Sequence, residues 1–190
     1  MHTNLNEIEL KKFPVLKTDR LELVEIKKCH LRDILDLFGN ENVTRFYNIL
    51  PFKNEENAQK FIELYHIRFK DGLGIRWGIS LKGEKNIIGT IGFNTFTKNH
   101  RANIGYDLKP EYWNHGYMSE ALNEVLDFGF NQLEINRIEA EVMQGNEGSE
   151  RVLHKLNFRK EGILRQWMLW DEKYYDMSMF ALLRVEYEKK

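Results

Sequence analysis

The sequence is poor in the residue types that mark several classes of protein. Its 190 residues include one cysteine, Cys29, which cannot form an internal disulfide and suits the reducing cytosol. No segment approaches the roughly 18 unbroken apolar residues of a membrane span, and the first residues lack the apolar core of a secretory signal. We therefore expect a soluble, cytoplasmic protein with no membrane partner.

The chain also lacks an excess of charge of either sign. Twenty-eight Lys and Arg face 29 Asp and Glu, which gives a net charge of −1. A protein whose main partner is nucleic acid would carry a strongly basic face, so we expect no such partner. The six histidines are scattered without the spacing of metal ligands, and no metal site is predicted.

The apolar content, in contrast, is ample for a packed core. Hydrophobic residues make up 42% of the chain and aromatic residues 13%. At about 150 residues per domain, this length favours a single domain over residues 1–190. Residues 1–12 are expected to form an N-terminal arm.

Hydrophobic periodicity predicts the order of strands and helices. Leu31, Ile34, Leu35 and Phe38 fall on one face of a helix, and the segment 137–142 alternates strictly, as a half-buried strand does. The same reasoning predicts strands over 21–26, 75–82, 86–97, 101–108, 161–170 and 174–184, and helices over about 58–69, 116–129 and 149–156. This order is no regular βα repeat and predicts a mixed α/β (α+β) fold with a largely antiparallel sheet.

The junction before the helix that opens near Gly116 is a candidate anion site. Pro110 stops the preceding strand, and Gly116 lets the backbone approach a ligand closely. The first N–H groups of a helix have no helical partners and suit a pyrophosphate, to which Ser119 could add a hydroxyl. An ordinary helix start is the alternative, because the chain lacks both the nucleotide-triphosphate loop and the three glycines of a dinucleotide fold.

A second junction follows the strand over 137–142. Asn146 is a natural cap for the next helix, and Ser149 lies one turn further. The two residues either form a capping pair or face a ligand that lies between the two junctions. Spacing alone leaves both interpretations open.

Together the two junctions resemble the GCN5-related N-acetyltransferases (GNAT), in particular the Rim-type ribosomal-protein N-terminal acetyltransferases. The resemblance covers about residues 13–184 and includes the segment Phe13-Pro14-Val15-Leu16-Lys17-Thr18-Asp19-Arg20-Leu21 near the start. Its strongest elements are Ile104-Gly105-Tyr106, Trp113-Asn114-His115-Gly116-Tyr117-Met118-Ser119-Glu120-Ala121, Arg137-Ile138-Glu139-Ala140, and the segment from Asn146 to Phe158 with Glu161-Gly162 at its end. It implies a sheet of about six to seven strands flanked by about four helices, and acetyl-CoA as co-substrate.

The resemblance also implies roles for individual residues. The pyrophosphate would be bound by the backbone of Asn114, His115, Gly116, Tyr117, Met118 and Ser119. The pantetheine arm would lie along the strand edge near Tyr106 and Leu108, and would bond to Asn146. Ser149 corresponds to a proposed donor to the leaving thiolate, whereas Arg151 and Lys155 either reach CoA phosphates or are solvated helix charges.

The general base is the weak point of the resemblance. Some Rim-type enzymes are thought to use a glutamate at the position that Met168 occupies here. The substitutes are Asp107, Glu139, Glu141 and Asp176, with Asp107 and Glu139 as the catalytic candidates beside Ser149. An α-amine with a pKa near 7.8 is already roughly 10–15% neutral at pH 7, whereas a lysine is well under 0.1% neutral. A weak base therefore favours an α-amine acceptor, such as the N-terminus of a ribosomal protein.

Two other functions stay open from the sequence. One is the acetylation of a small amine, for example a polyamine or an aminoglycoside. The other is a CoA-binding module that has lost catalysis, which Met168 favours because its side chain cannot take a proton.

Overall fold

The computed structural model describes residues 12–188, and its strands form one sheet. The neighbouring strands follow the order β1-β2-β3-β4-β5-β6-β8-β7, and every pair is antiparallel except β5 and β6. The strands are β1 (Leu16–Lys17), β2 (Leu21–Glu25), β3 (Ile75–Leu81), β4 (Ile87–Thr97), β5 (Arg101–Leu108), β6 (Arg137–Met143), β7 (Arg159–Trp170) and β8 (Lys173–Leu183).

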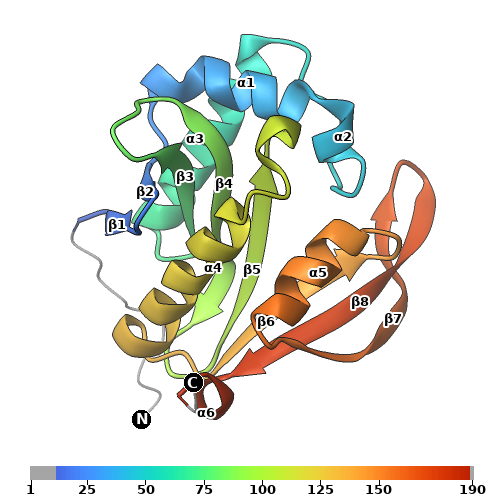
Figure 1. The fold of residues 1–190 in the computed structure, drawn as a ribbon. Helices are drawn as coiled ribbons and strands as arrows, with labels where there is room; N and C mark the ends of the chain where they lie inside the picture. The colour runs from blue at the N-terminus through green and yellow to red at the C-terminus, as the bar shows by residue number, and fades with distance from the viewer. Residues whose placement is uncertain (1–11, 189–190) are drawn as a thin grey trace.

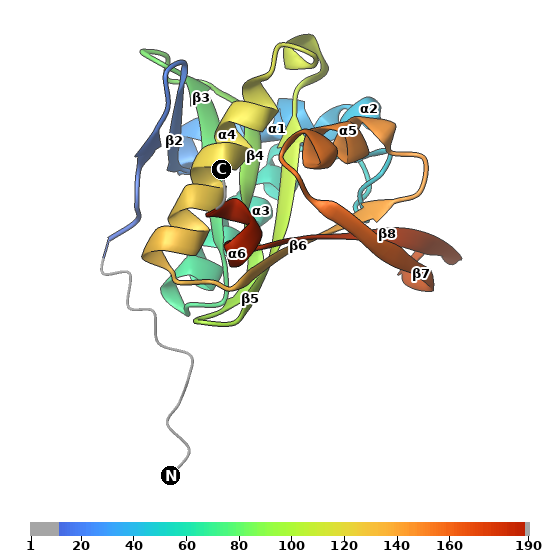
Figure 2. The same ribbon diagram turned by 60° about the horizontal axis from the view of Figure 1, so that its bottom comes forward.

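Helices cover both faces of the sheet. Figures 1 and 2 show α4 and α5 on one face, and α1 and α3 on the other. The helices are α1 (Leu31–Gly39), α2 (Glu41–Thr44), α3 (Glu55–Lys70), α4 (Tyr117–Asp127), α5 (Glu147–Lys155) and α6 (Arg184–Tyr187).

The mixed, largely antiparallel architecture confirms the fold predicted from the sequence. Within residues 12–188 there are eight strands and six α-helices, slightly more than the predicted six to seven strands and about four helices. The additional elements are β1, of two residues, and α2 and α6, of four residues each. Elements this short cannot show a hydrophobic period. Residues 1–11 of the predicted N-terminal arm lie outside the described residues.

The core has two parts, one on each face of the sheet. On one face α4 buries Leu122, Val125 and Leu126 completely. On the other face α1 and α3 meet through Phe38 and Phe61, whose ring centroids are 4.6 Å apart. Packing on both faces fixes β3, β4 and β5 as a rigid base for the elements that end near the site.

The two halves of the sheet separate between β5 and β6. These parallel strands pair only through Arg101–Arg137, Ala102–Ile138 and Asn103–Glu139. Beyond Asn103 they diverge, so the β6–β8–β7 limb swings away from the rest of the sheet in Figures 1 and 2. The remaining length of both strands therefore forms the two walls of a split.

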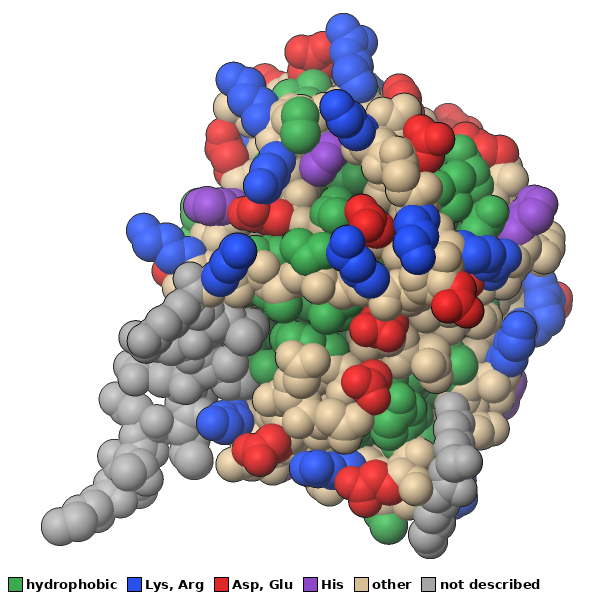
Figure 3. Space-filling view, turned by 60° about the vertical axis from the view of Figure 1, so that its left-hand side comes forward, with side chains coloured by type: hydrophobic (Ala, Val, Ile, Leu, Met, Phe, Trp, Pro, Cys, Tyr) green, Lys and Arg blue, Asp and Glu red, His purple; other side chains and the backbone are tan. Residues whose placement is uncertain are grey.

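The surface shows no segregation of charge on the face drawn in Figure 3. There, Lys and Arg side chains are interspersed with Asp and Glu side chains over the described residues. None of the helices in residues 12–188 is long and apolar enough to cross a membrane.

Candidate active site

A cavity of about 960 Å³ occupies the split between β5 and β6. We call it the cleft. On one side it is lined by the beginnings of α4 and α5, and this part is the α5 side. On the other side it is lined by Arg45, Tyr47, Tyr65, Arg68 and Asn94, and this part is the α3 side. The cleft thus joins both faces of the sheet through the gap between the strands.

The start of α4 presents backbone N–H groups to the α5 side. Gly116 is the N-cap and has φ = 81°, in the left-handed region that favours glycine. The first turn of α4 contributes Tyr117, Met118 and Ser119 to the cleft. Because N–H groups in the first turn of a helix have no helical partners, they carry the positive end of the helix dipole toward the cleft. An anion such as a pyrophosphate fits this position.

A cluster of charged and polar side chains anchors this helix start. Glu120 accepts hydrogen bonds from the Thr18 hydroxyl at 2.5 Å, from the Arg20 backbone N–H at 2.9 Å and from Arg20 Nε at 2.6 Å. Arg20 also donates to the carbonyl of His115 at 3.1 Å and lies over the Tyr117 ring. Partial burial opposes the effect, but these donors lower the pKa of Glu120. This role of Thr18 and Arg20 could not be predicted from the sequence, because it joins residues about a hundred positions apart.

The start of α5 faces the α4 loop across the cleft. Asn146 caps α5 by accepting a hydrogen bond from the Ser149 N–H at 3.2 Å, and both residues line the cleft. The pair is therefore a helix cap that also lines the cleft. The hydroxyl groups of Ser149 and Tyr106 share a hydrogen bond of 2.7 Å. Burial raises the pKa of Tyr106, so its phenol stays protonated.

Eleven of the twelve residues predicted to bind the cofactor line the cleft, and His115 does not. The eleven are Tyr106, Leu108, Asn114, Gly116, Tyr117, Met118, Ser119, Asn146, Ser149, Arg151 and Lys155. His115 instead holds its ring Nδ1 2.7 Å from the carbonyl of Trp113 and stacks on Tyr117. Arg151 pairs with Glu147 at 3.4 Å, on the exposed surface of α5.

Asp107, one of the predicted catalytic acids, borders the cleft but is already engaged. Its carboxylate accepts hydrogen bonds from Arg76 and from Thr90. Arg76 is 1% exposed and Asp107 8% exposed, so the pair is buried. Burial raises the pKa of Asp107, and the adjacent Arg76 and Thr90 oppose that rise. Asp107 thus forms a buried ion pair at the base of the cleft, which we call its floor.

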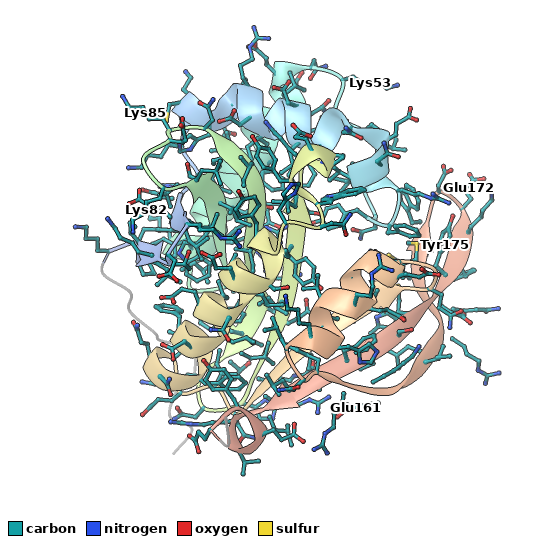
Figure 4. All side chains as sticks on the ribbon, in the orientation of Figure 1. Lys53, Lys82, Lys85, Glu161, Glu172 and Tyr175 are labelled. Carbon is teal, nitrogen blue, oxygen red and sulfur yellow. The ribbon has the colours of Figure 1, made fainter. Side chains whose placement is uncertain are left out.

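Glu139, the second predicted acid, is not brought to the cleft. Its carboxylate lies 2.6 Å from Arg137 Nε and 3.6 Å from Arg101 Nη1. Arg137 also pairs with Glu161, which Figure 4 labels at the closed end of the split. Glu139 therefore lies outside the cleft, because it is at the position where β5 and β6 still pair.

Glu141 lies two residues further along β6, beyond the point where the strands separate. Its side chain lines the cleft and accepts hydrogen bonds from Trp167 Nε1 at 3.1 Å and from Asn103 Nδ2 at 3.5 Å. Asp176, another acid left open by the sequence, instead accepts a bond of 2.7 Å from the Gln166 N–H. Of the four acids, Glu141 alone has a carboxylate that lines the cleft without an ion-pair partner among the described residues.

A polar chain connects Glu141 to the buried ion pair. Asn103 accepts from Asn94 Nδ2 at 2.9 Å, and Asn94 accepts from Arg76 Nη1 at 3.2 Å. Arg76 was not predicted as a site residue, although a charge inside the apolar strand Ile75–Leu81 is a usable signal. The contact between Trp167 and Glu141 was not predicted either. The register of β7 shifts between Leu164 and Met168, and no sequence pattern specifies that shift.

No group of three potential metal-binding side chains occurs within residues 12–188. The donor set of the cleft is instead that of an anion and polar-group site: backbone N–H groups, hydroxyls and amides. It offers a pyrophosphate cradle, hydrogen-bond donors near the split, and one carboxylate on the α3 side.

Comparisons with known proteins agree with this geometry. The model of the acetyltransferase (GNAT) domain matches residues 20–159. An uncharacterized N-acetyltransferase of Bacillus subtilis, YoaA, is 39% identical over 173 residues, which are 90% of this chain and 98% of that protein. The [ribosomal protein uS5]-alanine N-acetyltransferase of Escherichia coli is 30% identical over 115 residues, which cover 60% of this chain and 59% of that protein. A crystal structure of a GNAT-family acetyltransferase from Bacillus anthracis has a TM-score of 0.81 at 25% identity, covering 91% of this chain and 100% of that one.

The chain therefore belongs to the GNAT family. It is an N-acetyltransferase of a fold that uses acetyl-CoA. The family confirms the resemblance stated from the two junctions.

Proposed function

We propose that this N-acetyltransferase transfers the acetyl group of acetyl-CoA to the α-amine at the N-terminus of a peptide or protein, such as a ribosomal protein. The observation that carries the proposal is the continuity of the cleft. It runs from the N–H groups of α4, through the split beside Ser149, to the carboxylate of Glu141. Donor and acceptor can therefore meet from opposite faces of the sheet.

Acetyl-CoA binds on the α5 side of the cleft. The pyrophosphate lies at the N-terminus of α4, and the pantetheine arm runs between β5 and α5 beside Asn146. Residues of the cleft fit this group, because Gly116 brings the backbone close and the first-turn N–H groups point outward.

The reaction is the direct attack of the amine on the thioester. Glu141 takes one proton from the bound ammonium, which makes the nitrogen nucleophilic. The nitrogen then forms a bond to the acetyl carbon, the carbon–sulfur bond breaks, and the second proton of the nitrogen passes to the departing sulfur, which leaves as the CoA thiol. The departing sulfur accepts a hydrogen bond from Ser149, whose hydroxyl is bonded to the phenol of Tyr106. Because a thiol has a pKa near 8.5, the thiolate is a good leaving group and needs only modest assistance from this hydrogen bond.

An α-amine is favoured over a lysine side chain as the acceptor, because Glu141 is the one base that this mechanism assigns to remove the proton. An α-amine is partly neutral at pH 7, whereas a lysine must lose a proton held about three pKa units more tightly. The similarity to an enzyme named [ribosomal protein uS5]-alanine N-acetyltransferase supports a protein acceptor.

The test is thiol release from acetyl-CoA in the presence of matched amines. The panel holds peptides with a free N-terminus, the same peptides with a blocked N-terminus and one lysine, a polyamine and an aminoglycoside. We expect the free α-amines to be acetylated fastest. Faster acetylation of lysine or of a small polyamine would refute the proposal, and CoA binding without thiol release for any amine would indicate an inert module.

A further inference from the structure

The arginines of this chain are almost all paired with carboxylates. Of the eleven arginines in the sequence, all within residues 12–188, eight have a carboxylate oxygen within 4.0 Å. Three have no such partner among the described residues, namely Arg45, Arg68 and Arg165. Two of these, Arg45 and Arg68, line the α3 side of the cleft.

Arg68 is held in place without being neutralised. It lies on α3 and donates from Nη2 to the carbonyl of Leu73 at 3.2 Å and to the carbonyl of Asn94. Carbonyl oxygens orient a guanidinium but supply no full negative charge, and the fork of Arg68 keeps further donors. Arg45, just after α2, lies with its guanidinium 5.2 Å from the centroid of the Phe46 ring.

The acids of the cleft do not balance these two charges. Within residues 12–188, three acidic residues line it, namely Asp107, Glu141 and Glu147. Asp107 is bound to Arg76, and Glu147 to Arg151 on α5. Glu141 accepts from Trp167 and Asn103. The α3 side therefore carries uncompensated positive charge beside one hydrogen-bonded carboxylate.

Phosphate groups of CoA do not explain the two arginines. The α5 side already provides the N-terminus of α4, with Arg151 and Lys155 on α5. Arg68 lies on α3, which covers the opposite face of the sheet (Figure 1), and Arg45 follows directly after α2. Their anion must belong to the molecule that enters from that face.

We propose that Arg45 and Arg68 form an anion subsite for the acceptor, so that the preferred acceptor is an α-amine followed closely by a carboxylate, as in an acidic peptide N-terminus. This inference rests on the proposed function and adds its substrate class. Asn94 connects the two places where the acceptor would bind. Its backbone carbonyl accepts a hydrogen bond from Arg68, and its side chain donates to Asn103, which in turn donates to Glu141. An extended chain advances about 3.3 Å per residue, so the carboxylate falls within the first few residues after the amine.

The test compares three peptides that share their first residue and carry Asp and Glu, Asn and Gln, or Lys and Arg at positions two to four. Thiol release by the full chain gives kcat/KM for each peptide, and titration gives the Kd for CoA. We expect the acidic peptide to exceed the amide peptide about tenfold, equal to about 1.4 kcal/mol. The R45Q and R68Q variants should each reduce this ratio through KM, and R68K should restore part of it.

The control variant is R165Q, which removes the unpaired arginine that does not line the cleft and should keep the ratio. A free amino acid and its amide form a further arm that distinguishes a small carboxylate-bearing amine from a peptide. An equal or higher rate with the basic peptide would overturn the anion subsite, as would a ratio that survives R45Q and R68Q. If no α-amine peptide releases thiol while CoA binds, the proposed function itself fails instead.

Discussion

The sharpest prediction concerns Glu141→Gln. If Glu141 takes the proton of the acceptor, the wild-type protein uses all of the bound amine, whereas the variant uses only its neutral fraction. For an α-amine with a pKa of about 7.8, the variant should be about sevenfold slower at pH 7, about sixtyfold slower at pH 6, and nearly equal at pH 9. The shape and hydrogen-bonding capacity at this position are nearly unchanged, because glutamine retains an acceptor for Trp167 and Asn103. The measurement is kcat against pH with a saturating peptide.

Glu139→Gln is the matched control for this experiment. Glu139 lies on the same strand and the same face of β6 two residues earlier, but at the closed end of the split. Its loss removes a partly buried ion pair with Arg137 and a contact with Arg101, and we expect no deficit that depends on the ionisation of the amine. A deficit of Glu141→Gln that is constant from pH 6 to pH 9, or a pH-dependent deficit in Glu139→Gln, would refute the assignment.

Three further predictions address the frame of the site. Asp107→Asn leaves Arg76 buried without its charge partner and should cost about 3–5 kcal/mol in urea unfolding; normal stability with lost activity would instead favour Asp107 as the base. Gly116→Ala and Gly83→Ala, with φ of 81° and 85°, should each lose about 1–2 kcal/mol of stability, but only Gly116→Ala should weaken CoA binding in titration calorimetry. The lowered pKa of Glu120 stabilises the fold above about pH 4.5 and the effect is lost as the pH falls through the folded pKa, so Glu120→Gln should flatten the acid limb of the stability curve.

Most of the fold could be predicted from the sequence because its larger elements show clear periods. The strand 101–108 has the predicted bounds, and the strands predicted over 75–82, 86–97 and 137–142 differ by one residue at an end. The helix predicted over 58–69 begins earlier, at Glu55, because Asn54 caps it by accepting from the Asn57 N–H. A cap of this kind lies outside the apolar stripe from which the helix was recognised.

The site was predictable where function depends on the backbone and not where it depends on distant side chains. The α4 loop could be located because a glycine before a helix leaves a local signature. The base could not, since Glu139 and Glu141 obey the same alternation and differ only in their distance from the end of the β5–β6 pairing. That end is a property of two strands separated by residues 109–136, and a local pattern does not contain it.

The same split also explains why the floor of the cleft is polar. Past Asn103 and Glu139 no backbone hydrogen bond holds β6 beside β5, so the position of the β6 limb rests on side chains. Asn103 bonds to Glu141 on the α3 side, and Tyr106 bonds to Ser149 on the α5 side. Apolar residues at these positions would pack together and close the gap, because burial of apolar surface is favourable and has no direction. Directional polar contacts span the gap while leaving it open to a substrate, and the buried charges of the floor are the stability cost of keeping the two halves apart.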